Sequence, residues 1–214
     1  MFIDRVDAGR RLAAELARFK NENPCVLALP RGGVPVAVEI ARALRAPLDL
    51  VLVRKIGAPD QPELAVGAVV DGGRPEVVLN REIVDLLGIP DAYIADESAK
   101  QLKEIERRRT LYLAGRPRAE IAGRTALIVD DGIATGATIR AAILATRRAR
   151  PKRLVLAVPV APTDTLVALR TEADEVVCLE AYEAFGAIGL YYADFTQVSD
   201  EEVRALLAQP APSA

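Results

Sequence analysis

One stretch constrains this chain more than any other: a short apolar run that leads directly into two acids and a loop of small residues. Leu127-Ile-Val129 precedes Asp130-Asp131, and Gly132-Ile-Ala-Thr-Gly-Ala-Thr138 follows. Residues 139–150 then have the apolar spacing of a helix. A strand, two acids, a small-residue loop and a helix, in that order, indicate a ligand site at the end of a strand in an α/β sheet.

Short apolar runs alternate with helix-like segments through most of the chain. We expect strands at residues 26–29, 48–53, 67–70, 77–80, 125–129, 154–158 and 175–179. We expect helices at residues 10–19, 34–44, 91–114, 139–150 and 164–170, and a loop at residues 56–66, which hold two prolines and a glycine. This alternation predicts the α/β class, with a parallel sheet flanked by helices.

Composition excludes several classes of function. Apolar residues make up 51% of the chain, which is enough for a large core, and the net charge of −2 gives no reason to expect nucleic acid as a partner. Histidine is absent from the sequence. Catalysis by Ser–His or Cys–His pairs and the usual zinc sites are therefore excluded.

The chain has no sequence feature of a membrane or secreted protein. No apolar run reaches the roughly 20 residues that span a bilayer, and residues 10–19 have the charged, amphipathic pattern of a helix and not that of a secretory signal. We expect a cytoplasmic protein with no membrane partner. Cys25 and Cys178 each lie beside an apolar run, and we expect both to be buried, reduced thiols.

Three polar segments follow predicted strands, so they should meet at the carboxyl edge of the sheet. They are Arg31-Gly-Gly33, Arg54-Lys55 and residues 130–138. Residues 134–138 open a helix, where free backbone N–H groups bind phosphate. The two adjacent acids would repel a phosphate but suit the paired hydroxyls of a ribose, and the cations of the other segments suit a second anion. The three segments together predict a ribose 5-phosphate that carries another charged group, although Gly32-Gly33 or Arg54-Lys55 alone would be an ordinary turn.

These motifs resemble those of a known family. The run 127–138 resembles the phosphoribosyl pyrophosphate (PRPP) motif of type I phosphoribosyltransferases (PRTases), and Leu29-Pro-Arg-Gly-Gly33 resembles the pyrophosphate loop of that family. Arg54-Lys55 resembles the basic pair that opens the family's flexible loop, which would return to the sheet at Glu63-Leu-Ala-Val-Gly67. The resemblance covers about residues 2–207 and points to an uncharacterised bacterial branch with a long insert before the PRPP motif.

The resemblance implies a role for each motif. Asp130 and Asp131 would hold the ribose hydroxyls and, with Lys55, would be the catalytic residues. Mg²⁺ would bridge pyrophosphate and ribose oxygens, and a cis peptide bond is expected at Pro30–Arg31. The PRPP-binding residues implied by the three motifs are Arg31, Gly32, Gly33, Arg54, Lys55, Asp130, Asp131, Gly132, Ala134, Thr135, Gly136, Ala137 and Thr138.

Residues 182–195 hold five of the nine aromatic residues of the chain. They follow the last predicted strand, where type I enzymes place the hood that binds the acceptor base. By a loose resemblance to purine-using members, Phe185 is the candidate for stacking on an acceptor, and Asp194 is the candidate metal ligand. The alternative is that these aromatic residues are core packing for a small subdomain.

The domain organisation follows from the same resemblance. We predict one PRTase-like domain over residues 1–214, with a helical insert at 72–121, a hood-like segment at 182–207 and a disordered tail at 208–214. The insert contains a charged helix with the run Arg107-Arg-Arg109. That run is expected on a solvated helix face, and the alternative is that it binds phosphate.

The function that the resemblance implies is that of an enzyme. It would transfer the 5-phosphoribosyl group of PRPP to a nitrogenous acceptor such as a nucleobase, with Mg²⁺-assisted release of pyrophosphate, and a homodimer is common in the family. Two other functions stay open: a catalytically weak or silent sensor or regulator that binds PRPP or a nucleotide, and a phosphatase or nucleotide hydrolase on the same scaffold.

Overall fold

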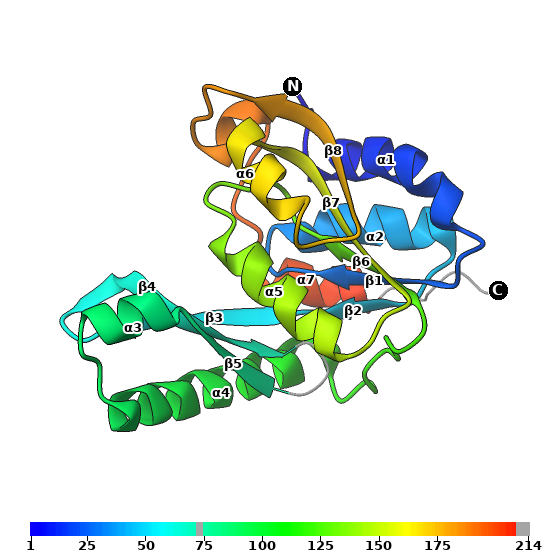
Figure 1. Ribbon diagram of the computed structural model, residues 1–214. Coiled ribbons are helices and arrows are strands. Elements are labelled where there is room, and N and C mark those ends of the chain that lie inside the picture. Colours follow the sequence, from blue (N-terminus) through cyan, green and yellow to red (C-terminus); the bar gives the residue numbers. More distant parts are fainter. Residues whose placement is uncertain (72–74, 209–214) are drawn as a thin grey trace.

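The centre of the molecule is a five-stranded parallel sheet with the strand order β2-β1-β6-β7-β8 (Figure 1). The structure is a computed structural model that describes residues 1–71 and 75–208. The strands are β1 (Pro24–Ala28), β2 (Leu48–Leu50), β6 (Thr125–Val129), β7 (Arg153–Pro162) and β8 (Glu175–Tyr182). The predicted α/β class, with a parallel sheet flanked by helices, is confirmed.

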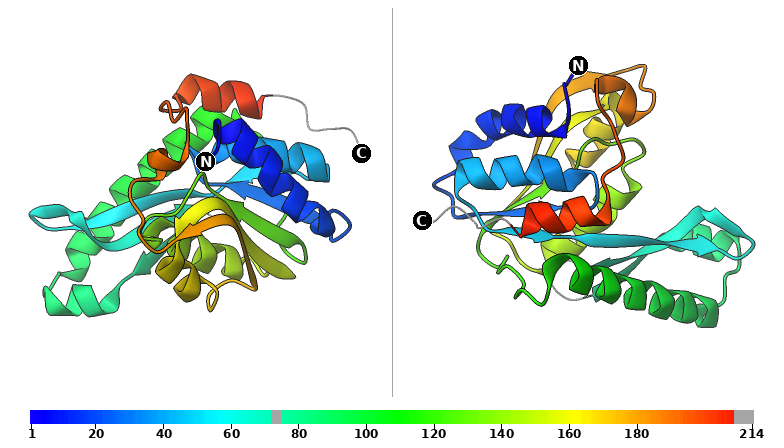
Figure 2. Two further views of the ribbon diagram at one scale, coloured as in Figure 1. Left: turned by 90° about the horizontal axis from the view of Figure 1, so that it is seen from above. Right: turned by 180° about the vertical axis from the view of Figure 1, so that it is seen from behind.

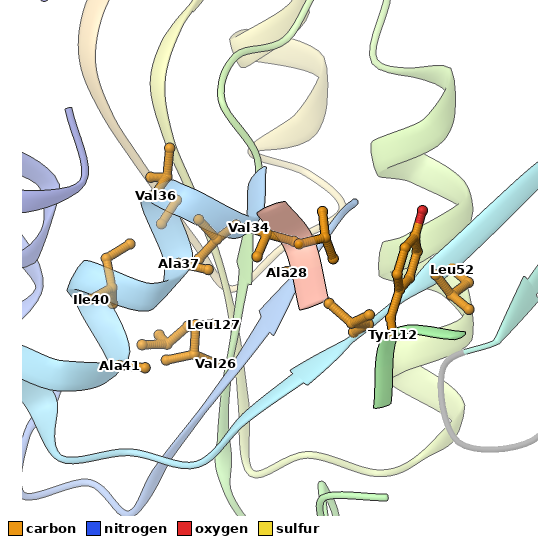
Figure 3. Packing of buried hydrophobic residues seen from close by; sticks show 14 of the residues in the cluster. Val26, Ala28, Val34, Val36, Ala37, Ile40, Ala41, Leu52, Tyr112 and Leu127 are labelled. Carbon is orange, nitrogen blue, oxygen red and sulfur yellow. The ribbon is translucent and has the colours of Figure 1, made fainter. Parts of the chain in front are cut away.

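Helices cover both faces of this sheet (Figure 2). One face carries α1 (Arg5–Leu16), α2 (Gly33–Leu44) and α7 (Asp200–Leu207), and the other carries α5 (Ala137–Arg148) and α6 (Thr163–Leu169). Successive side chains of a strand point to opposite faces. Val26 and Leu127 therefore join the cluster under α2 (Figure 3), whereas Leu27 and Ile128 join the cluster under α5. The central strands are almost wholly apolar because both of their faces are buried.

A second, antiparallel sheet extends to one side of the parallel sheet (Figure 1). It consists of β3 (Leu52–Ala58), β4 (Gln61–Asp71) and β5 (Pro75–Leu79), and it is accompanied by α3 (Arg81–Leu86) and α4 (Asp91–Leu113). We call these five elements the arm. The segment predicted as a helical insert, 72–121, thus contains strand β5 as well as two helices.

The prediction of a loop at residues 56–66 is wrong. These residues lie almost entirely in β3 and β4, which pair with each other from Leu52 opposite Asp71 to Ala58 opposite Gln61. Ile56 and Val66 are completely buried. Strand pairing and burial outweigh the local preference of glycine and proline for turns. The irregularities that remain are a register shift at Gly57 and a tight turn after Ala58.

A buried ion cluster joins the arm to the parallel sheet. Arg109 of α4 donates hydrogen bonds to Asp49 of β2 at 3.2 Å and to Asp71 of β4 at 3.3 Å. Arg118 also pairs with Asp71, whose side chain is completely buried. The two other arginines of the run pair with Glu104. Carboxylates of the chain therefore neutralise the whole run, which favours the structural interpretation over a phosphate site.

The N-terminus and the segment after β8 form one unit. Phe2 and Tyr192 form a parallel bridge, with hydrogen bonds from Phe2 N to Tyr191 O and from Ala193 N to Phe2 O, both of 2.8 Å. The short 3₁₀ helix η2 (Ile188–Tyr191) lies within this segment. Helix α7, which the sequence did not predict, packs against α2 and α4. It begins with a capping box between Ser199 and Glu202.

Some smaller expectations can also be compared with the structure. Cys25 is a buried free thiol and Cys178 a partly buried one, and burial raises the pKa of Cys25 to about 12. Neither thiol forms a disulfide, and the burial predicted for both is complete only for Cys25. Within the described residues, no helix combines the length and the apolar character that a membrane span needs. Of the tail predicted at 208–214, all but Ala208 lies outside the described residues.

Candidate functional site

The acidic pair lies immediately beyond the C-terminal end of β6, at the centre of the parallel sheet. Asp131 is buried, with 8% of its surface exposed, whereas Asp130 is half-buried. The backbone N–H of Asp131 donates to Oδ1 of Asp130 at 2.9 Å. The backbone of Asp131 therefore fixes the carboxylate of Asp130.

A cavity of about 190 Å³ adjoins this pair. Its lining is the small-residue loop 132–138 together with Asp130, Ile139 and Ile188. Gly136 has a φ of 77°, which favours glycine, and it caps the N-terminus of α5. The cavity therefore opens on the positive end of a helix of 12 residues, and the exposed Thr135 and Thr138 add hydroxyl donors.

The loop at Arg31-Gly-Gly33 packs directly against the acids. A Cβ atom at Gly32 would lie 2.0 Å from Oδ2 of Asp131, and one at Gly33 would lie 2.7 Å from the Val129 carbonyl oxygen. Only glycine permits such close approach. Two of the three segments predicted to converge thus meet at one point, and the cis peptide bond predicted at Pro30–Arg31 is present.

The side chain of Arg31 faces α7. Its Nη1 lies 3.6 Å from Oδ1 of Asp200, and the same Oδ1 accepts a hydrogen bond of 2.6 Å from the hydroxyl of Tyr112. Burial, together with the Asp200 contact, raises the pKa of Tyr112 to about 12. A protein carboxylate is therefore paired with the cation that was predicted to bind pyrophosphate.

The third segment, Arg54-Lys55, does not end a strand of the parallel sheet as predicted. Both residues lie inside β3, where they pair with Val69 and Ala68 of β4. The Nε of Arg54 donates to Oε1 of Gln101 on α4 at 3.0 Å, and the side chain of Lys55 is exposed. The prediction failed because the chain leaves the parallel sheet at Val51 and continues as an antiparallel strand of the arm.

Sequence reasoning missed Arg5, which pairs with the carboxylate of Asp131. Its Nε donates to Oδ2 of Asp131 at 2.7 Å, and each of the two side chains is only 11% exposed. The two residues are 126 positions apart in the chain. The contact arises because α1 packs beside α2 and brings its first residue to the end of β6, and a single sequence carries no local signal of such a contact.

The electrostatics of the two acids differ. Burial raises the pKa of Asp130 well above its usual range, and the negative charge of Asp131 raises it further. Burial also raises the pKa of Asp131, but there the hydrogen bond and the positive charge of Arg5 oppose the rise. The cation of Arg5 therefore favours the ionised form of Asp131, which can accept hydrogen bonds from ligand hydroxyls.

The two candidates after β8 have partners within the chain. Phe185 stacks on Tyr191 with ring centroids 4.9 Å apart, and Tyr191 stacks on Tyr182 at 4.6 Å. One face of Phe185 is therefore covered. Asp194 is exposed, and its Oδ1 accepts hydrogen bonds of 2.9 Å and 2.6 Å from the backbone and the hydroxyl of Thr196. These bonds lower the pKa of Asp194 and so keep it ionised.

The described residues contain no group of three or more acidic, cysteine or histidine side chains that could hold a metal ion. Magnesium is commonly held by one or two carboxylates, with water and substrate phosphates as the other ligands. The half-buried Asp130 beside the cavity is a donor of this kind. The site therefore fits a Mg²⁺ ion that is coordinated mainly by oxygens of a ligand.

The chain is similar to known proteins over most of its length. Residues 3–196 match the family model described as phosphoribosyl transferase domain. Proteins from two strains of Mycobacterium tuberculosis, which are named provisionally as phosphoribosyl transferases, are 48% identical over 207 residues. Those matches cover 97% of this chain and 46% of the relatives, so the chain spans about half of their length. A crystal structure of a protein from Thermus thermophilus is 46% identical, with 97% of each chain covered and a TM-score of 0.83.

Proposed function

Because the chain belongs to the phosphoribosyl transferase domain family, we propose that it transfers the 5-phosphoribosyl group of PRPP to a nitrogenous acceptor and releases pyrophosphate. The observation that carries this proposal is the packing of Gly32 and Gly33 onto Asp130 and Asp131 beside the cavity of loop 132–138. The cavity at a helix N-terminus, the two carboxylates and the loop with Arg31 supply the groups that a phosphate, a ribose and a pyrophosphate would need.

Each part of the ligand has a proposed site. The 5-phosphate would lie in the cavity, where it accepts hydrogen bonds from the backbone N–H groups of residues 134–138. The ribose hydroxyls would donate to the acidic pair. Pyrophosphate would lie at the loop 31–33, with Arg31 turned from Asp200 toward the ligand. Arg54 and Lys55 would approach the pyrophosphate from the arm, which for Arg54 requires loss of its bond to Gln101.

The reaction would break the bond from C1 of the ribose to a pyrophosphate oxygen and form a bond from C1 to the acceptor nitrogen. Positive charge develops on the ribose as pyrophosphate leaves, so the protein must hold the reactants in line and stabilise the departing anion. Mg²⁺ would neutralise part of the pyrophosphate charge. The acids would anchor the ribose ring, and the glycine loop would let the backbone approach the leaving group.

We propose that the acceptor is a nucleobase that binds near η2. Phe185 is half-buried, and its ring already stacks on Tyr191, so a base would extend this aromatic stack. Replacement of Phe185 by alanine is expected to weaken base binding by about 1–3 kcal/mol, which is the usual value of base–aromatic stacking, and to leave PRPP binding nearly unchanged. Equal losses for both ligands would favour core packing as the role of this ring.

The proposed activity can be tested directly. The protein is incubated with PRPP, Mg²⁺ and a panel of nucleobases, and the release of pyrophosphate is measured. We expect release that depends on one base or on a small group of related bases. Asp130→Asn should abolish it, whereas the control Asp164→Asn should not, because Asp164 is an exposed acid on α6 that bonds to its neighbour Thr165.

The same experiment separates the other two functions. Tight binding of PRPP without turnover with any base would favour a sensor or regulator. Release of phosphate from a mononucleotide in the absence of PRPP would favour a hydrolase. If calorimetry detects no binding of PRPP at millimolar concentration, the assignment of the cavity and the acidic pair to this ligand is wrong.

A further inference from the structure

Arg5 is held on three sides at the start of α1. Its Nε donates to Oδ2 of Asp131 at 2.7 Å, and its Nη1 donates to the Thr196 carbonyl oxygen at 2.8 Å. The guanidinium carbon lies 3.8 Å from the centroid of the Phe195 ring. These contacts use the planar, forked shape of arginine, which lysine cannot reproduce. The guanidinium therefore joins the end of β6 to the segment after β8.

Asp131 is enclosed by the partners of this unit. The carboxylate lies between Arg5 and the backbone of Gly32. The hydroxyl of Tyr192 donates to the Asp131 carbonyl oxygen at 2.6 Å, and the Tyr192 ring packs between those of Phe2 and Phe195. Side chain and backbone of this acid are thus both fixed by the N-terminal segment and the residues that follow η2.

We propose that Arg5 is a positioning residue for ribose recognition: it orients the Asp131 carboxylate so that the acidic pair accepts the hydroxyls of the ribose. The proposal rests on the proposed function, because it assumes a ribose phosphate in this site. It assigns Arg5 no contact with the ligand. Its effect passes through Asp131 alone, while Thr196 and Phe195 hold Arg5 in place.

Removal of the guanidinium has a specific expected effect. Without the hydrogen bond and the cation of Arg5, the Asp131 carboxylate is no longer held in one orientation and turns toward water. This movement weakens the hydrogen bond that it accepts from a ribose hydroxyl. The phosphate contacts at residues 134–138 are made by backbone groups of another element and remain. The preference for a complete ribose should therefore fall, while the binding of the phosphate group should not.

The test measures this preference in the full chain by calorimetry. The probes are ribose 5-phosphate, 2-deoxyribose 5-phosphate and 3-deoxyribose 5-phosphate. The variants are Arg5→Met, which removes the charge, and Arg5→Lys, which keeps the charge but not the fork. Arg10→Met is the matched control, because Arg10 lies on the same helix and pairs with Glu39 through a side chain that is 70% exposed.

We expect the wild type and Arg10→Met to prefer ribose 5-phosphate by about tenfold or more over at least one deoxy sugar, as a hydrogen bond to a charged group implies. In Arg5→Met that preference should fall to about threefold or less, with the affinity for the deoxy sugar nearly unchanged. Arg5→Lys should lie between the two. If Arg5→Met does not fold, a reduced preference in Arg5→Lys carries the same support.

Two results would overturn the inference. If the Arg5 variant that folds keeps the wild-type preference, or loses affinity for all three probes in parallel, Arg5 has a structural role only. If the wild type binds none of the probes, the proposed function fails and this inference fails with it. If the wild type binds ribose 5-phosphate and the Arg5 variants keep the same preference over the deoxy sugars, only this inference fails and the proposed function stands. Failure of the inference can therefore be distinguished from failure of the proposed function.

Discussion

Replacement of Gly32 by alanine tests the central contact of the site. Gly32 has a φ of −60° and a ψ of −35°, which any residue can adopt, so the substitution causes no backbone strain. The added Cβ, however, would lie 2.0 Å from Oδ2 and 2.5 Å from Cγ of Asp131. The three shortest contacts of the added Cβ are therefore all with this one carboxylate.

The size of the effect follows from the distances. Ordinary contact begins at 3.4 Å, so the atoms must separate by at least 1.4 Å, which is 3.4 minus 2.0. Asp131 cannot yield freely because Arg5 holds its Oδ2 and Tyr192 holds its backbone. Overpacking of this kind costs about 1–3 kcal/mol. For a chain of this length the expected fall in Tm is about 2–12 °C, and PRPP binding should be lost as the acid moves.

The assay is urea unfolding of a double-mutant cycle. Gly32→Ala is measured in the wild type and in an Asp131→Ala background, where the clashing atoms are absent. We expect the cost to fall to within about 0.5 kcal/mol of zero in that background. Gly115→Ala is the control: Gly115 has a φ of 78° and no atom within 4 Å of an added Cβ, so its cost comes from the backbone and should be the same in both backgrounds.

An equal cost of Gly32→Ala in both backgrounds would refute this reasoning. It would mean that the loop 31–33 does not press on Asp131, and that the observation carrying the proposed function is wrong. A coupling energy above about 1 kcal/mol would support the packing as described, because residues in contact typically couple by about 0.5–3 kcal/mol.

Three further predictions concern charges around the site. The pKa of Asp130 is raised in the folded state. The contribution of this carboxyl group to stability is therefore complete below the unfolded-state pKa of about 3.9 and is lost as pH rises through the folded-state pKa. Asp130→Asn should unfold at a higher urea concentration than the wild type at pH 8, and the difference should be small at pH 4. Asp200→Asn removes the carboxylate that competes for Arg31, so calorimetry should show affinity for inorganic pyrophosphate increased by about 1.5- to 5-fold, as the exposed pair implies, and a decreased affinity would count against competition. Arg109→Met removes the cation shared by the buried carboxylates of Asp49 and Asp71, and it should lower the free energy of unfolding by about 3–5 kcal/mol. Arg107 is exposed, so Arg107→Met should change the free energy of unfolding by less than about 1 kcal/mol. Equal effects of the two substitutions would argue against a buried ion cluster.

The sequence was sufficient for the parts of the fold that rest on local pattern. The strand at 125–129 was predicted with its observed bounds because its residues form an almost wholly apolar run that the acids end. The meeting of Gly32 with Asp131 was predicted as well, since both follow adjacent parallel strands. Arg54-Lys55 was misplaced because an apolar run does not reveal that a chain leaves one sheet for another.

Other features depend on contacts that no single segment encodes. Helix α3 has only 6 residues and α7 only 8, which is too short for a clear apolar period. Arg5 looks like any charged residue at a helix start, and its role follows only from the packing of α1 beside α2. The sequence therefore identified the residues that line the cavity at the end of β6, but not Arg5, which holds Asp131 beside it.

The arm and the loop 31–33 are connected through one face of α4. Arg109 and Tyr112 are three residues apart on this helix and so lie on the same side of it. Arg109 is anchored to Asp49 and Asp71, while Tyr112 holds Asp200, the carboxylate that pairs with Arg31. Because α4 is a continuous helix of 23 residues, it cannot shift at one of these points without disturbing the other. Release of Arg31 to a ligand therefore requires either movement of α7 or rotation of the Arg31 side chain alone, and only the first would also loosen the hydrogen bond of Tyr112.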